Sequence, residues 1–349
     1  MTENPDSTSE RKKEHINLCL TDDVSFKHKS NGFDKYDFVH HAATEVEIDK
    51  INFSSKFLDK KIDYPFLISC MTGGTGEAEN INAQLAEVAN SLNIPLGVGS
   101  QRQALENKKF HQSYKVIRKN APSIPILGNI GASQIANSNS VEQFQFLVDL
   151  VEADALVIHL NPLQELMQEE GQPSFKGLRK KIRKVVKLLS VPVIVKEVGS
   201  GISYNTAKIL LDCGVTGIDV AGAGGTSWAG VEIMRRKKNA GDDTFWDWGL
   251  PTSYCIREVK KLKKKYSFCL IGSGGISNSE DCAKALALGS DIVASARPLL
   301  QELSKSGVDG VTKLITNWFE DVRRMMFLTG SQNLNEFHRN KIIRRENLY

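Results

Sequence analysis

One segment decides the fold class: residues 191–220 read VPVIVKEVGSGISYNTAKILLDCGVTGIDV. It holds an apolar run of strand length (Val191–Val195), a stretch with helical period (Tyr204–Cys213) and a second apolar run (Val215–Val220). The two runs are nearly continuously apolar, as is typical of parallel strands that are buried on both faces. The segment therefore predicts a strand–helix–strand unit of a parallel sheet.

The same unit recurs along the chain. Six further strands are expected at Phe66–Cys70, Leu96–Val98, Ile124–Leu127, Ala155–Leu160, Phe268–Ile271 and Ile292–Ala294. Further helices are expected at Glu77–Leu92, Glu106–Asn120, Val141–Glu152, Gly177–Leu189, Thr252–Lys264, Ser279–Leu288 and Leu299–Ser304. Eight uninterrupted units predict an α/β protein with a closed (β/α)8 TIM barrel and favour it over an open, doubly wound sheet.

The length of 349 residues exceeds the about 250 residues of such a barrel. We expect a disordered tail at 1–10, an N-terminal arm at 11–63 with a strand-like piece at Glu45–Ile51, the barrel at 64–305 and a helical C-terminal extension at 306–349. The longest gap between strands, Ala221–Leu250, is rich in glycine and aromatic residues. It has two equally supported interpretations: a mobile active-site lid, or a surface excursion whose tryptophans pack on the barrel.

Composition excludes several classes of protein. Apolar residues make up 41% and charged residues 25% of the chain, which excludes wholesale disorder. The net charge of +4 is too small to indicate nucleic acid, and no apolar run approaches the about 20 residues that span a bilayer. Six dispersed cysteines and a polar N-terminus predict a protein of the reducing cytoplasm. The basic runs Arg179–Lys187 and Lys260–Lys265 have helical spacing and predict solvated helix faces, whereas Arg11–Lys13 does not.

Functional groups of a barrel gather where the strands end at their carboxyl side. Gly272–Gly275 and Ala296–Pro298 each follow a strand and precede a helix, which predicts a pair of phosphate-binding turns. Lys196 ends a buried strand and is either a Schiff-base nucleophile or a cation beside an electron-rich cofactor. A flavin fits better alongside the pair of phosphate-binding turns, with Asn129 and Thr72 at two further strand ends.

A second set of residues suits a phosphorylated substrate. Glu165 follows the fourth strand, and Mg²⁺ commonly takes one carboxylate together with water and substrate phosphates. Arg11 and His15 are four residues apart and share one face of a helical turn, with Lys12 beside them. Arg102 can add a planar fork for a phosphate group.

These motifs together resemble the type 2 isopentenyl diphosphate isomerases. The resemblance runs in order from Arg11 to about Leu300 and is most specific in its first two pieces. They are N-P-L-Q-E (Asn161–Glu165), R-K-x-x-H (Arg11, Lys12, His15), M-T-G-G (Met71–Gly74), G-S-Q-R (Gly99–Arg102), V-K-E (Val195–Glu197) and A-G-x-G-G-T (Ala221–Thr226).

The resemblance implies an enzyme that interconverts isopentenyl and dimethylallyl diphosphate with FMN, Mg²⁺ and NADPH as flavin reductant. FMN would be held by Thr72, Gly73, Gly74, Ser100, Asn129, Lys196, Thr226, Gly274, Gly275, Ala296 and Arg297. The diphosphate would be held by Arg11, Lys12, His15, Ser100, Gln101 and Arg102. Glu165 would bind Mg²⁺, and Gln164 would lie beside the reacting carbons of the substrate, near His159 and Asn161. A homo-oligomer, a tetramer or octamer, is implied as well.

Moving a double bond requires that a proton is added at one carbon and that another proton is removed from a second carbon. No side-chain pair at the strand ends looks like a strong acid, so we expect reduced FMN to transfer the proton at its N5 edge. Gln164 would orient or relay a proton, and Glu197 or Glu232 would tune the polarity. NADPH would then only reduce the flavin, because the reaction has no net redox change.

Two other functions remain open at this point. One is an FMN barrel oxidoreductase of the hydroxy-acid oxidase or nucleotide dehydrogenase type. Its catalytic cysteine has no counterpart here, because Cys70 and Cys269 are expected inside strands. The other is a non-catalytic barrel that binds a phosphorylated ligand, which would not need the complete Asn161–Glu165 set.

Overall fold

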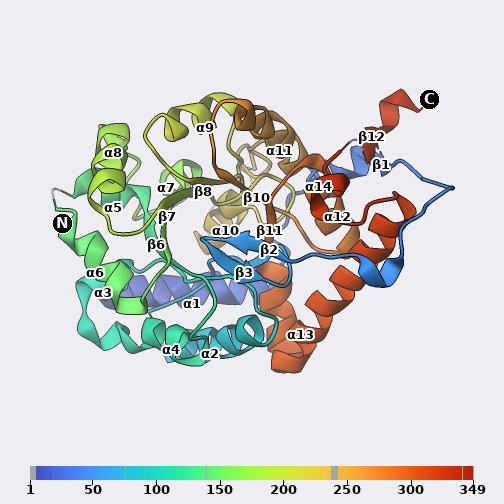
Figure 1. Ribbon diagram of the computed structural model, residues 1–349. Helices are drawn as coiled ribbons and strands as arrows, with labels where there is room; N and C mark the ends of the chain where they lie inside the picture. Colours follow the sequence, from blue (N-terminus) through green and yellow to red (C-terminus); the bar gives the residue numbers. More distant parts are fainter. Residues whose placement is uncertain (1–4, 75, 139, 237–242, 340, 349) are drawn as a thin grey trace.

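The eight predicted strands close into one parallel barrel. The computed structural model describes residues 5–74, 76–138, 140–236, 243–339 and 341–348. The strands hydrogen-bond in the order β10-β11-β4-β5-β6-β7-β8-β9 and form a closed ring (Figure 1). They are β4 (Phe66–Ile68), β5 (Leu96–Gly97), β6 (Ile126–Gly131), β7 (Ala155–Leu160), β8 (Val193–Glu197), β9 (Gly217–Asp219), β10 (Cys269–Ser273) and β11 (Ile292–Ser295). The (β/α)8 prediction is confirmed.

Helices cover the outside of the ring (Figure 1). Those that follow the barrel strands are α2 (Gly76–Ser91), α3 (Arg102–Glu106), α4 (Gln112–Asn120), α5 (Ala132–Asn137), α6 (Glu142–Val151), α7 (Pro162–Met167), α8 (Leu178–Leu188), α9 (Tyr204–Leu211), α10 (Trp228–Arg235), α11 (Thr252–Lys260) and α12 (Ser279–Leu288). The helix expected at Glu106–Asn120 is interrupted. The Asn107 side chain accepts from Lys109 N and starts a separate 3-10 turn, Lys108–Phe110.

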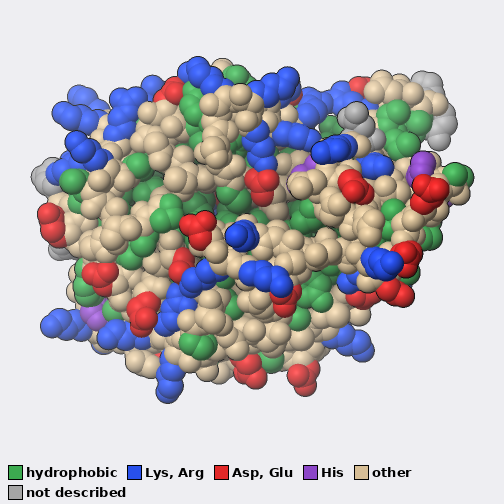
Figure 2. Space-filling model, in the orientation of Figure 1, with side chains coloured by type: hydrophobic (Ala, Val, Ile, Leu, Met, Phe, Trp, Pro, Cys, Tyr) green, Lys and Arg blue, Asp and Glu red, His purple; other side chains and the backbone are tan. Residues whose placement is uncertain are grey.

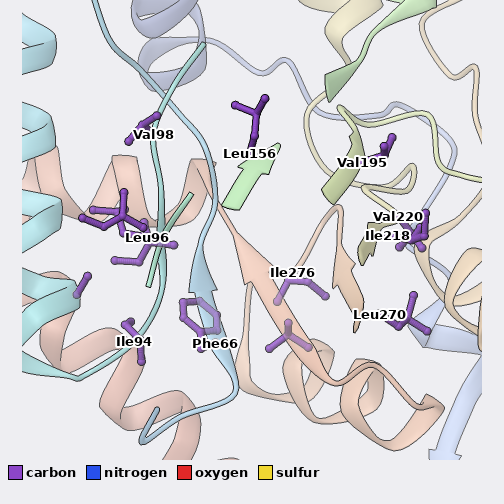
Figure 3. Packing of buried hydrophobic residues seen from close by; sticks show 14 of the residues in the cluster. Phe66, Ile94, Leu96, Val98, Leu156, Val195, Ile218, Val220, Leu270 and Ile276 are labelled. Atoms are coloured by element: carbon purple, nitrogen blue, oxygen red, sulfur yellow. The ribbon is translucent and has the colours of Figure 1, made fainter. Parts of the chain in front are cut away.

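Side chains of the strands alternate between two hydrophobic clusters. Phe66, Leu156 and Val195 point outward toward the helices, as Figure 3 shows for several strands. Their neighbours Leu67 and Ile194 point into the barrel. The inner cluster also contains Phe57 and Ile62 of the hairpin β2 (Ser55–Phe57) and β3 (Lys60–Ile62), so this hairpin closes the amino-terminal end of the barrel.

The N-terminal arm differs from the prediction in two places. Helix α1 (Pro5–Thr21) begins inside the expected tail, of which residues 1–4 lie outside the described residues. The prediction of a strand-like piece at Glu45–Ile51 was wrong, because a 3-10 turn occupies Ile48–Lys50. A short strand, β1 (Tyr36–Phe38), pairs instead with β12 (Ile342–Arg344) near the other end of the chain.

The C-terminal extension begins as a continuation of the last barrel helix. Helix α13 (Arg297–Leu328) breaks at Gly307, whose φ of 67° is a left-handed conformation that glycine adopts readily. It packs against α12 and α2 and is followed by α14 (Leu334–Phe337). The long helix thereby fastens the extension to the barrel wall.

The Ala221–Leu250 insertion is partly helical and packs on the arm. Helix α10 lies within it, and Trp246 is buried and donates through its indole N–H to Ser25 O at 2.8 Å. Trp248 in contrast is 59% exposed. Residues 237–242 of this insertion lie outside the described residues.

Helix α8 carries the basic run Arg179–Lys187 on its solvent side. Ile182 and Val185 are buried, whereas Arg179, Arg183 and Lys187 are exposed, so the prediction of a solvated face is confirmed. Figure 2 shows the lysine and arginine side chains along the upper left margin, where Figure 1 places α8. Within the described ranges, no helix is long and apolar enough to cross a bilayer.

Candidate active site

A cavity of about 550 Å³ opens at the carboxyl ends of the barrel strands. The alternation of side chains explains its floor. Since Ile194 points into the barrel, so does Lys196 two residues later, and the same parity brings Asn129 and His159 to that level. A polar layer thus covers the apolar interior of the barrel.

Most predicted site residues line this cavity. They are Arg11, Lys12, His15, Thr72, Ser100, Arg102, Asn129, His159, Asn161, Gln164, Glu165, Lys196, Thr226, Gly274, Gly275, Ala296 and Arg297. Arm, barrel and insertion therefore meet at one site, although their residues are up to 286 positions apart in the sequence.

Two glycines of the turn after β10 pack too closely on neighbouring backbone for side chains to fit. A Cβ on Gly274 would lie 2.1 Å from Gly222 O, and one on Gly275 would lie 2.6 Å from Gly224 O. Both residues have positive φ, 103° and 70°. The turn after β10 therefore exposes bare backbone to the cavity, which suits the approach of a phosphate group.

Arg297, at the second predicted phosphate turn, also fastens the arm. Its guanidinium donates to Cys19 O at 3.0 Å, Asp22 O at 2.8 Å and Ser25 Oγ at 3.0 Å. The end of α1 is thus held to the start of α13. This contact fixes where the arm crosses the cavity.

Polar groups in the floor are individually oriented. Lys196 Nζ donates to Glu197 O at 2.7 Å, and the Glu197 carboxylate accepts from the amides of Val198, Gly199 and Ser200. The adjacent strand contributes Asp219, which pairs with Lys196 in register and accepts from Ser273 Oγ. Sequence reasoning missed Asp219, although the alternation along β9 points to it.

His159 is held as a neutral imidazole. Its Nδ1 lies 2.9 Å from Asn129 Oδ1, and Asn129 Nδ2 donates to Val98 O. Burial, together with the nearby Lys196 and Lys12 charges, lowers the pKa of His159 to about 3. The ring can therefore donate a hydrogen bond but is not an acid reservoir at neutral pH.

Lys12 sits in a cage of oxygen atoms. Its Nζ donates to Gly73 O at 2.6 Å and Ser100 O at 3.1 Å, and lies 3.4 Å from the Tyr114 hydroxyl. Burial, together with the Arg11 and Arg102 charges, lowers the pKa of Lys12 to about 7. The arm thereby delivers a cation to the two turns expected to face the cofactor and the substrate.

Three predicted residues, Gln101, Gly73 and Gly74, are not part of the cavity lining. Gln101 is fully buried; its amide donates to Leu147 O at 2.9 Å and its oxygen accepts from Asn129 N at 2.9 Å. Its side chain therefore braces β6 and α6 and faces away from the cavity. Gly73 and Gly74 lie behind the rim, packed on Tyr114 and Gln103 respectively.

The N-P-L-Q-E segment starts α7 at the cavity wall. Asn161 Nδ2 donates to Gln164 Oε1 at 3.3 Å and to Glu165 Oε1 at 3.1 Å, while the other Glu165 oxygen accepts from Gln172 N at 2.8 Å. Asn161 Oδ1 is buried without a hydrogen-bond partner. A buried acceptor in this position awaits a donor from a ligand or water.

Glu232 of α10 connects the two sides of the cavity. One carboxylate oxygen lies 3.0 Å from His15 Nε2 and accepts from Gln164 Nε2 at 3.2 Å. The other accepts from Arg235 Nη1 at 2.6 Å. The His15 and Arg235 contacts outweigh burial and lower the pKa of Glu232 to about 2. Sequence reasoning gave Glu232 only a general polarity role and missed Arg235.

Cys70 lies elsewhere than its sequence context predicts. It was expected inside the first strand, but β4 ends at Ile68 and Cys70 lines the cavity. Burial raises the pKa of its thiol to about 12, so it stays protonated at neutral pH. Cys70 therefore lies where a nucleophile could reach a ligand, but the protonated thiol is a poor nucleophile.

The fold and the site together define the class of protein. A model of the FMN-dependent dehydrogenase family matches residues 6–116 and 132–344, and the chain belongs to that family. Within it, the chain is 45% identical to the isopentenyl-diphosphate delta-isomerase of Chlorobaculum parvum, over 93% of this chain and 94% of the relative. The isopentenyl-diphosphate delta-isomerase of Pyrococcus furiosus is 40% identical over 95% and 86% of the two chains. The chain is a member of the type 2 isopentenyl-diphosphate isomerases.

Solved structures support the fold alone. The lactate oxidase of Pediococcus acidilactici superposes with a TM-score of 0.70 at 15% identity, covering 99% of this chain and 95% of the oxidase. A flavocytochrome b2 reaches a TM-score of 0.68 at 18% identity, covering 94% of this chain and 82% of that one. The barrel and the segments around it are thus shared in fold with a lactate oxidase and a flavocytochrome.

Proposed function

We propose that this protein interconverts isopentenyl and dimethylallyl diphosphate, using reduced FMN and Mg²⁺ at the cavity above the barrel. One observation carries the proposal. A single cavity combines a glycine-lined phosphate turn, the arm cations and the Asn161–Glu165 segment. Family membership supports the same reaction, because the relatives named above are isomerases of this diphosphate.

The chain's own residues fit FMN. The turn at Gly274 and Gly275 leaves backbone exposed where a phosphate would lie, and Lys196 supplies a cation beneath the cavity. When bound and reduced, FMN would supply an electron-rich ring and a proton-exchanging N5 edge. The other residues that would hold it are Thr72, Ser100, Asn129, Thr226, Ala296 and Arg297, with Gly73 and Gly74 supporting the turn from behind.

The opposite wall fits a diphosphate. Arg11, Lys12 and Arg102 bring positive charge to it, and His15 and Ser100 add further polar groups. Glu165 would be the protein ligand of Mg²⁺. No cluster of three His, Cys, Asp or Glu side chains suits a metal in the described part of the chain, so phosphates and water would complete the octahedron.

Gln164 is the side chain best placed to handle a proton at the substrate. Its oxygen accepts from Asn161 and its nitrogen donates to Glu232, so the orientation of the amide is defined at both ends. Helix α1 contacts α10, and both contribute side chains to the cavity lining, so these helices would help to shield a cation-like intermediate from water. His159 contributes a neutral hydrogen-bond donor rather than a strong acid.

The test uses purified protein reconstituted with FMN and Mg²⁺. After reduction by NADPH, it should isomerise isopentenyl diphosphate through many turnovers without consuming further reductant. Oxidised enzyme, or enzyme without Mg²⁺, serves as the control and should be inactive. NADPH consumption in step with product would instead support an oxidoreductase, and tight ligand binding without turnover would support a non-catalytic barrel. Light scattering on the same sample tests the expected tetramer or octamer.

A further inference from the structure

Arg235 holds carboxylates from three separate segments at the mouth of the cavity. Its Nε lies 2.9 Å from Glu14 of α1, Nη1 lies 2.6 Å from Glu232 of α10, and Nη2 lies 3.5 Å from Glu170 in the turn after α7. The guanidinium is only 11% exposed, whereas Glu14 and Glu170 are 56% and 41% exposed. Arg235 therefore lies beneath the surface and links two exposed carboxylates, Glu14 and Glu170, to the buried carboxylate of Glu232.

We propose that Arg235 is a positioning residue: it fixes Glu232 against Gln164 and His15, and it latches α1 and the turn after α7 onto the neighbouring helix α10. The inference rests on the proposed function, since Gln164 and His15 matter only if substrate binds there. Arg235 itself does not line the cavity, so its effect would be transmitted through Glu232 and Glu14.

The geometry suits arginine in particular. Each of three guanidinium nitrogens faces a different carboxylate, whereas a lysine ammonium is a single point charge that does not reproduce this planar fork. Removing Arg235 would leave Glu232, which is 1% exposed, with the His15 imidazole and the Gln164 amide as its remaining side-chain neighbours. Leaving a buried carboxylate with a weaker partner is costly, so Glu232 would move or take up a proton.

The contact between Arg235 and Glu14 also determines the position of the basic side chains of α1 that would bind the diphosphate. Glu14 and His15 are neighbours on α1, and Arg11 and Lys12 lie one turn earlier on the same helix. Holding Glu14 therefore holds the face of α1 that lines the cavity. Loss of Arg235 should loosen this face even when no substrate is present.

The experiment compares Arg235→Gln with a matched control, Arg236→Gln, an exposed residue at the end of the same helix. In FMN- and Mg²⁺-loaded enzyme, Arg235→Gln should lower kcat/KM at least tenfold, and Arg236→Gln should stay within twofold of wild type. The acidic limb of the kcat/KM profile should move to higher pH in Arg235→Gln, because the groups facing Glu232 would be reduced to His15 and the neutral Gln164. Arg235→Lys should recover only part of the loss.

A second readout needs no activity. Limited trypsin digestion followed by mass spectrometry measures cleavage at Arg11–Lys13, which should be several-fold faster in Arg235→Gln than in Arg236→Gln. If Arg235→Gln does not fold, Glu14→Gln removes the link to α1 at an exposed residue and should raise KM with little change in kcat. Inactive wild-type enzyme would overturn the proposed function, and digestion would still test the latch. Equal activity, pH profile and cleavage in the two arginine variants would overturn the role of Arg235.

Discussion

Gln164 Nε2 donates a hydrogen bond of 3.2 Å to Glu232 Oε1, and this contact joins the neighbouring helices α7 and α10 beside the cavity that Gln164 lines. The two residues are 68 positions apart and lie on segments that follow different barrel strands. Because Asn161 donates to the other end of the Gln164 amide, Gln164 presents defined polar atoms to the cavity. The predictions below follow from this arrangement and its surroundings.

Glu232→Gln should impair turnover more than binding. The substitution keeps the side-chain shape but removes the charge that faces His15 and Arg235, and it allows the Gln164 amide to rotate. We expect kcat to fall at least tenfold, with a change of less than threefold in KM. Steady-state kinetics with the FMN- and Mg²⁺-loaded enzyme measure both, and an unchanged kcat would contradict the role given to this carboxylate.

The same residue makes a prediction about acid stability. The folded state lowers the pKa of Glu232 from 4.5 to about 2, so its contribution is present above about pH 4.5 and disappears as the pH falls through 2. A shift of this size corresponds to roughly 3 kcal/mol at neutral pH. In urea titrations, wild type should exceed Glu232→Gln in unfolding free energy at pH 7, and the gap should shrink between pH 4.5 and 2. A gap that does not vary with pH would refute this linkage.

Lys12 predicts a rise of stability with pH as well, but in an alkaline window. Burial lowers its pKa in the folded state from 10.5 to about 7, so the unfolded chain binds the extra proton between these values. Its contribution to stability therefore rises from about pH 7 to 10.5, and Lys12→Met should remove that rise. The diphosphate should bind the charged form, so 1/KM should fall above pH 7 in wild type and be low and flatter in Lys12→Met. Parallel profiles of the two proteins would count against the assignment.

Gly73→Ala should destabilise the turn after β4. An added Cβ would lie 2.2 Å from the Tyr114 ring, which is itself fully buried and cannot retreat easily. We expect a loss of about 1–3 kcal/mol in unfolding free energy and weaker retention of FMN on gel filtration. Gly76→Ala is the matched control, because nothing lies within 4 Å of its added Cβ. Equal stability and flavin content of the two variants would contradict the packing argument.

Much of the barrel could be predicted because its determinants are local. Apolar runs such as Val191–Val195 and helical periods such as Ser279–Leu288 can be identified in short windows of sequence. The missed features depend on contacts between distant segments. Strand β1 pairs with β12 about 300 residues later, and Arg235 meets Glu14 over 221 positions, so no local pattern predicts either.

The site shows the same division. The parity of the strands predicts that Lys196 and Asn129 face one level of the barrel, and they do. Gln101 shares the G-S-Q-R motif with Ser100 and Arg102, but it turns away because its amide satisfies backbone groups of β6 and α6. The direction in which a side chain points after a strand depends on such buried hydrogen-bond partners. The spacing of residues in the sequence does not reveal these partners.

Glu165→Gln should raise the Mg²⁺ concentration needed for half-maximal activity by at least tenfold. An amide oxygen is a weaker ligand for Mg²⁺ than a carboxylate, and Glu165 is the carboxylate that lines the cavity beside Gln164. Glu169→Gln is the control, since that residue is exposed four positions later. Titration of activity with Mg²⁺ distinguishes them, and identical curves would remove Glu165 from the metal site.

The central claim is that this cavity catalyses isomerisation with reduced flavin and no net oxidation. The most direct measurement is proton NMR of isopentenyl diphosphate in D2O with FMN-loaded enzyme, Mg²⁺ and one equivalent of NADPH, a two-electron reductant, per flavin. We predict many turnovers to dimethylallyl diphosphate, with deuterium entering the product and the flavin still reduced at the end. Absence of dimethylallyl diphosphate, or product limited to one equivalent as the flavin oxidises, would contradict the account.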